Sequence, residues 1–129
     1  MSYALNITKE ADHLHIEATG TRTPETLMAV AKDCVDACKK HECTRFFLDV
    51  QGMTGQLSTI DTYQFATKPL LALGRRLGLK AAIIDVGDNI DRLRFFEDVA
   101  VNIGMDLRVF SNASKALQWL RGSQRPEGE

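Results

Sequence analysis

The chain has 129 residues, 44% of them hydrophobic, and a formal net charge of -1. This length and apolar content predict one compact domain with an ordinary core and leave no room for a second domain. Acidic and basic residues nearly cancel, and no basic stripe alternates with aromatic residues, so a nucleic-acid partner is not expected.

The apolar segments, the N-terminal stretch and the cysteine count indicate the cellular compartment in which the protein is expected. No window reaches the roughly 18 apolar residues of a membrane span, and the N-terminal stretch lacks a basic region followed by an apolar core. Cys34, Cys38 and Cys43 make an odd count without a disulfide framework, which suits a reducing compartment. We therefore expect a cytoplasmic protein without a membrane span.

The first segment of the chain predicts a hairpin. Residues 3–8 and 13–18 alternate apolar and polar side chains, which indicates two half-buried strands joined by the polar stretch 9–12. His13, His15 and Glu17 share one face of the second strand, where they could bind a metal. A solvated sheet face is the interpretation we favour, because no further His or Cys cluster completes the ligand shell.

A helix is predicted from Pro24 to about His41. Thr23 caps it, and Pro24 occupies the first turn, where a missing N–H is harmless. Cys34 and Cys38 fall on its apolar stripe and, with His41, have a spacing that could converge on a metal. A thiol on an apolar face is usually a small core side chain, and no Cys-x-x-Cys motif supports zinc, so we favour the core.

Residues 46–50 form an apolar run that predicts a short strand buried on both faces. Gly52 and Gly55 then allow the backbone to turn sharply, and Ser58 or Thr59 can cap a following helix. In open α/β sheets the carboxyl end of a central strand is where ligands and partners usually meet the protein. Any function is therefore expected at this junction.

The next helix is predicted over residues 60–78, with a kink or split near Thr67 because Pro69 would remove a helical hydrogen bond. Some apolar residues lie off its main apolar face, so the helix carries more apolar surface than a single core contact requires. It could cover a ligand crevice or a dimer partner, or have a wide buried face. The residues concerned are Tyr63, Phe65, Leu71 and Leu73.

The remaining segments predict strands at 80–86 and 107–110 and helices at 90–103 and 113–121. Gly87, Asp88 and Asn89 are expected to turn the chain and cap the first of these helices, and Asn112 the second. The result is an α/β fold with a mixed five-stranded sheet, an N-terminal hairpin followed by parallel crossovers, covered by four helices. We expect one domain over residues 1–121 and a disordered tail over 122–129.

This order of elements resembles the STAS or SpoIIAA-like fold of anti-sigma-factor antagonists. The segment 92–120 also resembles small bacterial STAS/SEC14-type proteins of unassigned role. The residues that carry the second likeness are Phe95, Phe96, Glu97, Val99, Ala100, Gly104, Arg108, Val109, Phe110, Ala116, Leu117, Trp119 and Leu120.

The STAS family has a switch motif, an aspartate in the central strand followed by a helix-capping Asp-Ser-Ser-Gly whose first serine is phosphorylated to release a protein partner. Laid on this chain without gaps, it falls on Asp49, Gly52, Ser58 and Thr59. The chain departs from the motif where Leu57 and Ile60 replace its aspartate and glycine, and where Gly55 and Gln56 replace two apolar residues. The resemblance implies a phospho-switch at Ser58, whereas the residues alone favour a plain helix cap.

Catalytic alternatives find less support in the residues. Asp49 and Asp85 should emerge at the carboxyl ends of adjacent strands near Asp88, where they could hold Mg²⁺ or form a phospho-receiver pocket. The acidic pair and the lysine of a receiver are missing, so loop-capping carboxylates are favoured. Ser58 lacks a G-x-S-x-G elbow, and the glycines of the loop lack the lysine of a phosphate loop. We expect neither an enzyme nor a cofactor.

Two functions follow from the sequence. The first is a regulatory or protein-interaction module whose partner is another protein or a second copy of the chain. The alternative is a carrier or sensor of a small apolar ligand, which the surplus apolar residues near Pro69 and the SEC14-type likeness favour.

Overall fold

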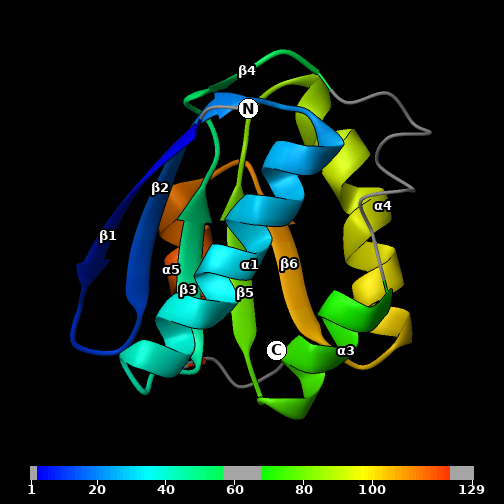
Figure 1. Cartoon of the computed structure of the whole chain (residues 1–129). Helices are drawn as coiled ribbons and strands as arrows, with labels where there is room; N and C mark the ends of the chain where they lie inside the picture. The colour runs from blue at the N-terminus through cyan, green and yellow to red at the C-terminus, as the bar shows by residue number, and fades with distance from the viewer. Residues whose placement is uncertain (1–2, 57–67, 123–129) are drawn as a thin grey trace.

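The structure, a computed structural model, describes residues 3–56 and 68–122. Its elements, shown in Figure 1, are β1 (Tyr3–Lys9), β2 (Leu14–Thr21), α1 (Pro24–Lys40), β3 (Arg45–Asp49), β4 (Met53–Thr54), α3 (Lys68–Arg76), β5 (Lys80–Ile84), α4 (Asp88–Asn102), β6 (Asp106–Phe110) and α5 (Ala113–Arg121). Apart from Gly122, the tail predicted over 122–129 lies outside the described residues.

The strands form one mixed sheet. Its order is β1-β2-β3-β5-β6, with β1 antiparallel to β2 and every later pair parallel. The predicted hairpin followed by parallel crossovers is thereby confirmed. Within the described residues there is also a sixth strand that the sequence did not predict, because the two-residue β4 is too short to show a period and pairs with the end of β2.

Helices cover both faces of the sheet, as Figure 1 shows. Helices α1, α3 and α4 lie on one face and enclose the larger core, while α5 is the described helix on the other face. The central strand β3 contributes to both cores, since Phe46 and Leu48 point to the first and Phe47 to the second. The prediction that this strand is buried on both faces is confirmed.

Helix ends follow the predicted chemistry with one exception. Thr23 Oγ1 accepts a hydrogen bond from Thr26 N at 3.1 Å, and Asn112 Oδ1 accepts one from Lys115 N at 3.0 Å, so both caps are confirmed. The predicted side-chain cap of α4 is wrong. The capping position is Gly87, which has φ +60° and no side chain to accept a bond, because Asp88 already lies inside the helix.

Helix α3 has a wide buried face, which is one of the alternatives that the sequence left open. Leu70 and Leu77, on the expected apolar face, pack on the core, and Gly74 on the same face is buried. Leu71, placed off that face by the sequence pattern, is 3% exposed and belongs to the core, and Leu73 is half-buried against it. The described helix begins at Lys68, so the part expected over residues 60–67 lies outside the described residues. Pro69 lies in its first turn, where a missing N–H costs little.

None of the helices within residues 3–56 and 68–122 is long and apolar enough to cross a membrane.

Candidate functional site

The loop that follows β3 lies at the carboxyl edge of the sheet. Asp49 ends the strand, and its Oδ1 accepts hydrogen bonds from the backbone N of Gln51 at 2.9 Å and from Gln51 Nε2 at 3.2 Å. A Cβ on Gly52 would lie 3.2 Å from Thr19 Cγ2, so the loop packs closely on β2 there. Gly55 has φ +84°, a conformation that L side chains rarely adopt. The loop geometry depends on both glycines.

A buried arginine forms hydrogen bonds with the backbone of this loop. Arg22 Nη1 donates to the carbonyl oxygens of Met53 at 2.6 Å and Gly55 at 2.8 Å. Its Nη2 donates to the carbonyl of Val50 at 3.0 Å and to Asp85 Oδ1 at 2.7 Å. Arg22 follows β2 and is 8% exposed. One guanidinium therefore fixes three loop carbonyls and ties the loop to the end of β5.

Asp85 is the other half of this ion pair and is fully buried. Its Oδ1 also accepts from the backbone N of Val86 at 2.8 Å. Burial raises the pKa of the Asp85 carboxyl, and the hydrogen bond from Val86 and the charge of Arg22 offset part of that rise. Oδ2 has no hydrogen-bond partner among the described residues, so the carboxylate is only half satisfied.

The half-satisfied carboxylate borders a cavity of about 10 Å³, which is roughly the space of one water molecule. Asn89, in the first turn of α4, also lines it, and Asn89 Oδ1 is buried without a hydrogen-bond partner in the described part of the chain. Its described lining residues are Arg22, Leu27, Val50, Asp85, Asn89, Arg92 and Leu93.

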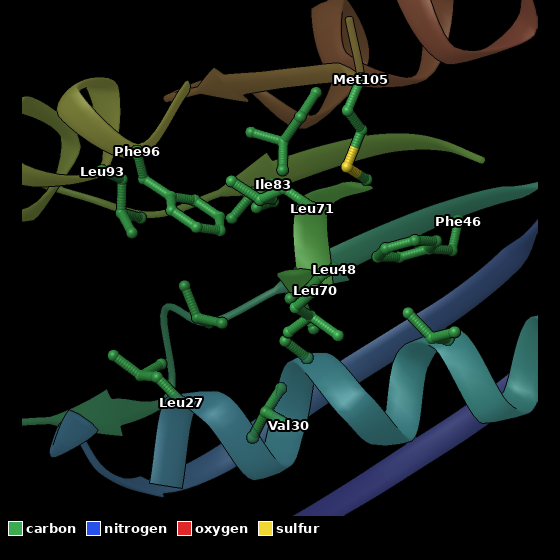
Figure 2. Close-up of a pocket in the computed structure, with 14 residues that line it drawn as sticks. Leu27, Val30, Phe46, Leu48, Leu70, Leu71, Ile83, Leu93, Phe96 and Met105 are labelled. Carbon is green, nitrogen blue, oxygen red and sulfur yellow. The ribbon is translucent and has the colours of Figure 1, made fainter. Parts of the chain in front are cut away.

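A second cavity, of about 60 Å³, lies between the sheet and the helices on its larger core. Figure 2 shows side chains of α1, α3, α4 and the central strands around this space, with the thioether of Met105 at one side. All of its described lining residues are apolar, including Leu27, Val30, Phe46, Leu48, Leu70, Leu71, Ile83, Leu93, Phe96 and Met105.

The structure brings some of the candidate residues together. Asp49 and Ile84 are paired across β3 and β5, which places Asp49 and Asp85 at neighbouring strand ends. Leu71 lines the larger cavity, whereas Leu73 packs on the core outside its lining. Four of the sequence candidates lie outside the described residues, namely Ser58, Thr59, Tyr63 and Phe65.

The face of β2 that carries His15 and Glu17 is partly solvated, so the interpretation favoured from the sequence is confirmed for Glu17 and wrong for His13. The side chains of His15 and Glu17 are 31% and 52% exposed, whereas His13 is buried with its Nδ1 2.7 Å from Asp12 Oδ1. The His15 ring lies 4.8 Å from the ring of Phe47 on the neighbouring strand β3. Within residues 3–56 and 68–122, no three His, Cys, Asp or Glu residues are grouped to hold a metal ion.

Cys34 and Cys38 lie in the core, as predicted. Burial raises the pKa of both thiols, that of Cys38 to about 12. His41 is exposed at the end of α1 and does not join them in the core.

Two residues of the carboxyl edge, Arg22 and Asn89, were given no functional role from the sequence. Arg22 stands between a strand and a helix cap, a position typical of an exposed turn residue. A partial signal was available in the sequence: Asp85 directly follows the apolar run over residues 81–84, and an aspartate at the end of a buried strand needs a cation or other donors nearby. Asn89 was interpreted as a cap, which accounts for its side chain without a pocket.

Comparison with known proteins rests on structure. The sequence matches no family model, and no curated protein matches it significantly. An anti-sigma factor antagonist from Mycobacterium paratuberculosis superposes with a TM-score of 0.61 at 12% identity, over 93% of this chain and 95% of that one. An uncharacterised protein with a SpoIIAA-like fold from Shewanella loihica superposes with a TM-score of 0.53 at 21% identity, over 92% and 93%.

At these identities the likeness establishes the fold. The chain has a STAS/SpoIIAA-like α/β fold, as its order of elements predicted.

Proposed function

We propose that this chain is a non-catalytic regulatory module that acts by binding another protein. The observation that carries the proposal is the superposition of nearly the whole chain on an anti-sigma factor antagonist, a protein named for its effect on another protein. The candidate carboxylates also have structural tasks, since Asp49 caps its own loop and Asp85 pairs with Arg22. These engagements support a binding role over a catalytic one.

The docking surface we propose is the carboxyl edge, centred on the loop over residues 51–56, which is exposed except at Met53. Arg22 holds the backbone of this loop, so little conformational entropy remains to be lost when a partner binds. Ser58 and Thr59 follow Gln56 closely in the chain. A phosphate on Ser58 would add nearly two negative charges beside the loop and change the surface that a partner meets.

A photo-crosslinking amino acid at Gln56, incorporated in cells of the source organism, tests this surface. Gln56 is exposed and its side chain makes no hydrogen bond to another described residue, and Lys32 on the exposed side of α1 is the matched control position. We expect a partner protein to be captured at Gln56 and not at Lys32. The purified partner should then bind the chain, and Ser58→Asp should weaken that binding relative to Ser58→Ala.

Capture at both positions, or at neither, would contradict the proposed surface. A cross-link to a second copy of the chain would replace the protein partner with a homodimer, which light scattering of the purified chain would then show.

A second candidate function, a carrier or sensor of a small apolar ligand, is favoured by the larger cavity. An engineered apolar cavity of about 150 Å³ stays dry and binds benzene or xenon. A cavity of about 60 Å³ with an apolar lining is less than half that size and suits a body of about three carbon atoms. Its walls offer dispersion contacts that water cannot use.

Xenon is a suitable probe because it binds dry apolar cavities without polar contacts. We expect xenon-saturated buffer to raise the thermal midpoint of the chain. Ala31→Val fills part of the lining and should reduce this rise, whereas Ala72→Val makes the same change on α3 outside the lining and should not. Equal xenon responses in the two variants would end this candidate.

A further inference from the structure

The two cavities share a wall. Leu27, Val50 and Leu93 line both the apolar space of about 60 Å³ and the small space of about 10 Å³ beside Asp85. Among the described residues the larger space is lined by apolar side chains alone, whereas the smaller one presents two buried oxygen atoms, Asp85 Oδ2 and Asn89 Oδ1. The larger, apolar compartment therefore adjoins a polar compartment that is large enough for one small chemical group.

The polar compartment presents unsatisfied hydrogen-bond acceptors. Oδ2 of the Asp85 carboxylate and the amide oxygen of Asn89 are both acceptors, and neither has a partner among the described residues. The nearby guanidinium of Arg22 is already committed to three loop carbonyls and to the other oxygen of Asp85. Arg92, which also lines the space, is partnered as well.

Buried acceptors without donors are costly, so a group that donates to both oxygens is favoured there. A carboxylate or carbonyl would place a further acceptor against them and be repelled. A primary ammonium group is about the size of the small space and has three N–H donors, enough for both oxygens, whereas a hydroxyl has a single O–H and can donate to only one of them. Water satisfies the same two atoms, and a ligand head group must therefore replace it with equivalent bonds.

We infer that the two adjacent cavities together bind a small amphipathic molecule with a short alkyl body and a primary ammonium head. The alkyl body lies in the apolar cavity, and the head donates to Asp85 Oδ2 and Asn89 Oδ1. In the bound state, the side chains of Leu27, Val50 and Leu93, which line both cavities, flank the ligand where its two parts join. This inference rests on the apolar-ligand function proposed above and specifies the class of ligand.

The experiment compares three probes with the same alkyl chain, 1-propanol, propylammonium and propanoate, titrated into the full chain. Binding is followed by calorimetry and by the amide signal of Val86, whose N donates to Asp85. We expect propylammonium to bind at least tenfold more tightly than propanoate. 1-Propanol should bind more weakly than propylammonium, because its single O–H can donate to only one of the two oxygens.

The xenon experiment distinguishes failure of the inferred donor head group from failure of the apolar-ligand function on which that inference rests. If xenon binds and the three probes bind equally or not at all, the donor site is overturned while the apolar cavity stands. If neither xenon nor any probe binds, both are overturned.

Variants locate the head group. Asn89→Ala removes one acceptor and should weaken the donor probe roughly two- to tenfold while leaving the xenon response unchanged. Asp91→Ala is the matched control, because Asp91 is exposed in the same first turn of α4 and lines neither cavity. Asp85→Asn should weaken the probe further, and if that variant fails to fold, Asn89→Ala decides alone. Equal affinity of the donor probe for Asn89→Ala and Asp91→Ala contradicts the site.

Discussion

Arg22 Nη2 lies 2.7 Å from Asp85 Oδ1, and the two residues are 8% and 0% exposed. Arg22→Met should lower the free energy of unfolding by about 3–5 kcal/mol, because it leaves the Asp85 charge buried without its partner. Three loop carbonyls lose their donor as well. Urea denaturation measures the change. Lys32→Met, which breaks the exposed pair with Asp36, is the control and should cost less than about 1 kcal/mol.

The double variant Arg22→Met with Asp85→Leu should recover part of the loss, since removing both charges removes the desolvation cost of each. If Arg22→Met costs no more than Lys32→Met, the pair does not stabilise the fold as described.

Much of this fold could be predicted because local chemistry and global packing agree. The apolar run of β3 is short and lies between turn residues, so its burial on both faces follows from its composition. Thr23 and Asn112 are helix caps, and each side chain accepts a hydrogen bond from a backbone N–H three residues later. Because the partners are so close in the chain, such caps can be predicted from the sequence. These features involve residues close in the chain.

The carboxyl edge could be predicted only in part, because its decisive contacts join distant residues. Arg22 and Asp85 are separated by 63 positions, and no periodicity indicates that a turn arginine will be buried. The burial of His13 likewise does not follow from the alternation of β2, because His13 precedes the strand. Leu71 lies in the core because the buried face of α3 is wider than the single apolar row drawn from the sequence.

A substitution at Gly74 should make the apolar cavity smaller, although Gly74 is not among its described lining residues. A Cβ at Gly74 would lie 2.8 Å from Met105 Sδ and Cε, and Met105 lines the cavity. Because this thioether is flexible and has space beside it, we expect it to turn into the cavity in Gly74→Ala. The variant should gain up to about 1 kcal/mol of stability from helix propensity and respond less to xenon.

Gly78→Ala is the opposing control. Gly78 follows α3 with φ +68° and nothing within 4 Å, so its replacement costs about 1–2 kcal/mol through backbone strain alone. A larger loss in Gly74→Ala than in Gly78→Ala would show that Met105 cannot move.

The three cysteines should differ in reactivity. Cys34 and Cys38 are buried, and burial raises the pKa of Cys38 to about 12, so its thiol stays protonated and inert at pH 8. Cys43 is half-buried. Iodoacetamide labelling followed by mass spectrometry should therefore modify Cys43 first, and the core thiols only as the chain unfolds. Rapid labelling of Cys38 in a Cys43→Ser variant would contradict this order.

Asp12 links the hairpin to α5 and should carry an acid-dependent part of the stability. The hydrogen bond from His13 lowers the pKa of the Asp12 carboxyl below its usual 3.8, and the charges of His13 and Arg121 act in the same direction. A carboxyl whose pKa is lowered by folding stabilises the fold above the unfolded value. That stabilisation is lost as the pH falls from about 3.8 through the folded pKa.

The carboxyl ¹³C signal of Asp12, followed by NMR from pH 6 to pH 2, measures the folded pKa directly. We expect the midpoint to move up toward the ordinary value in His13→Gln, because the hydrogen bond is the largest cause of the shift. Arg121→Gln is the graded control and should move it less, since Arg121 Nε lies 3.2 Å from Oδ2 at an exposed site. A larger shift from Arg121→Gln than from His13→Gln would reverse the assignment of the cause.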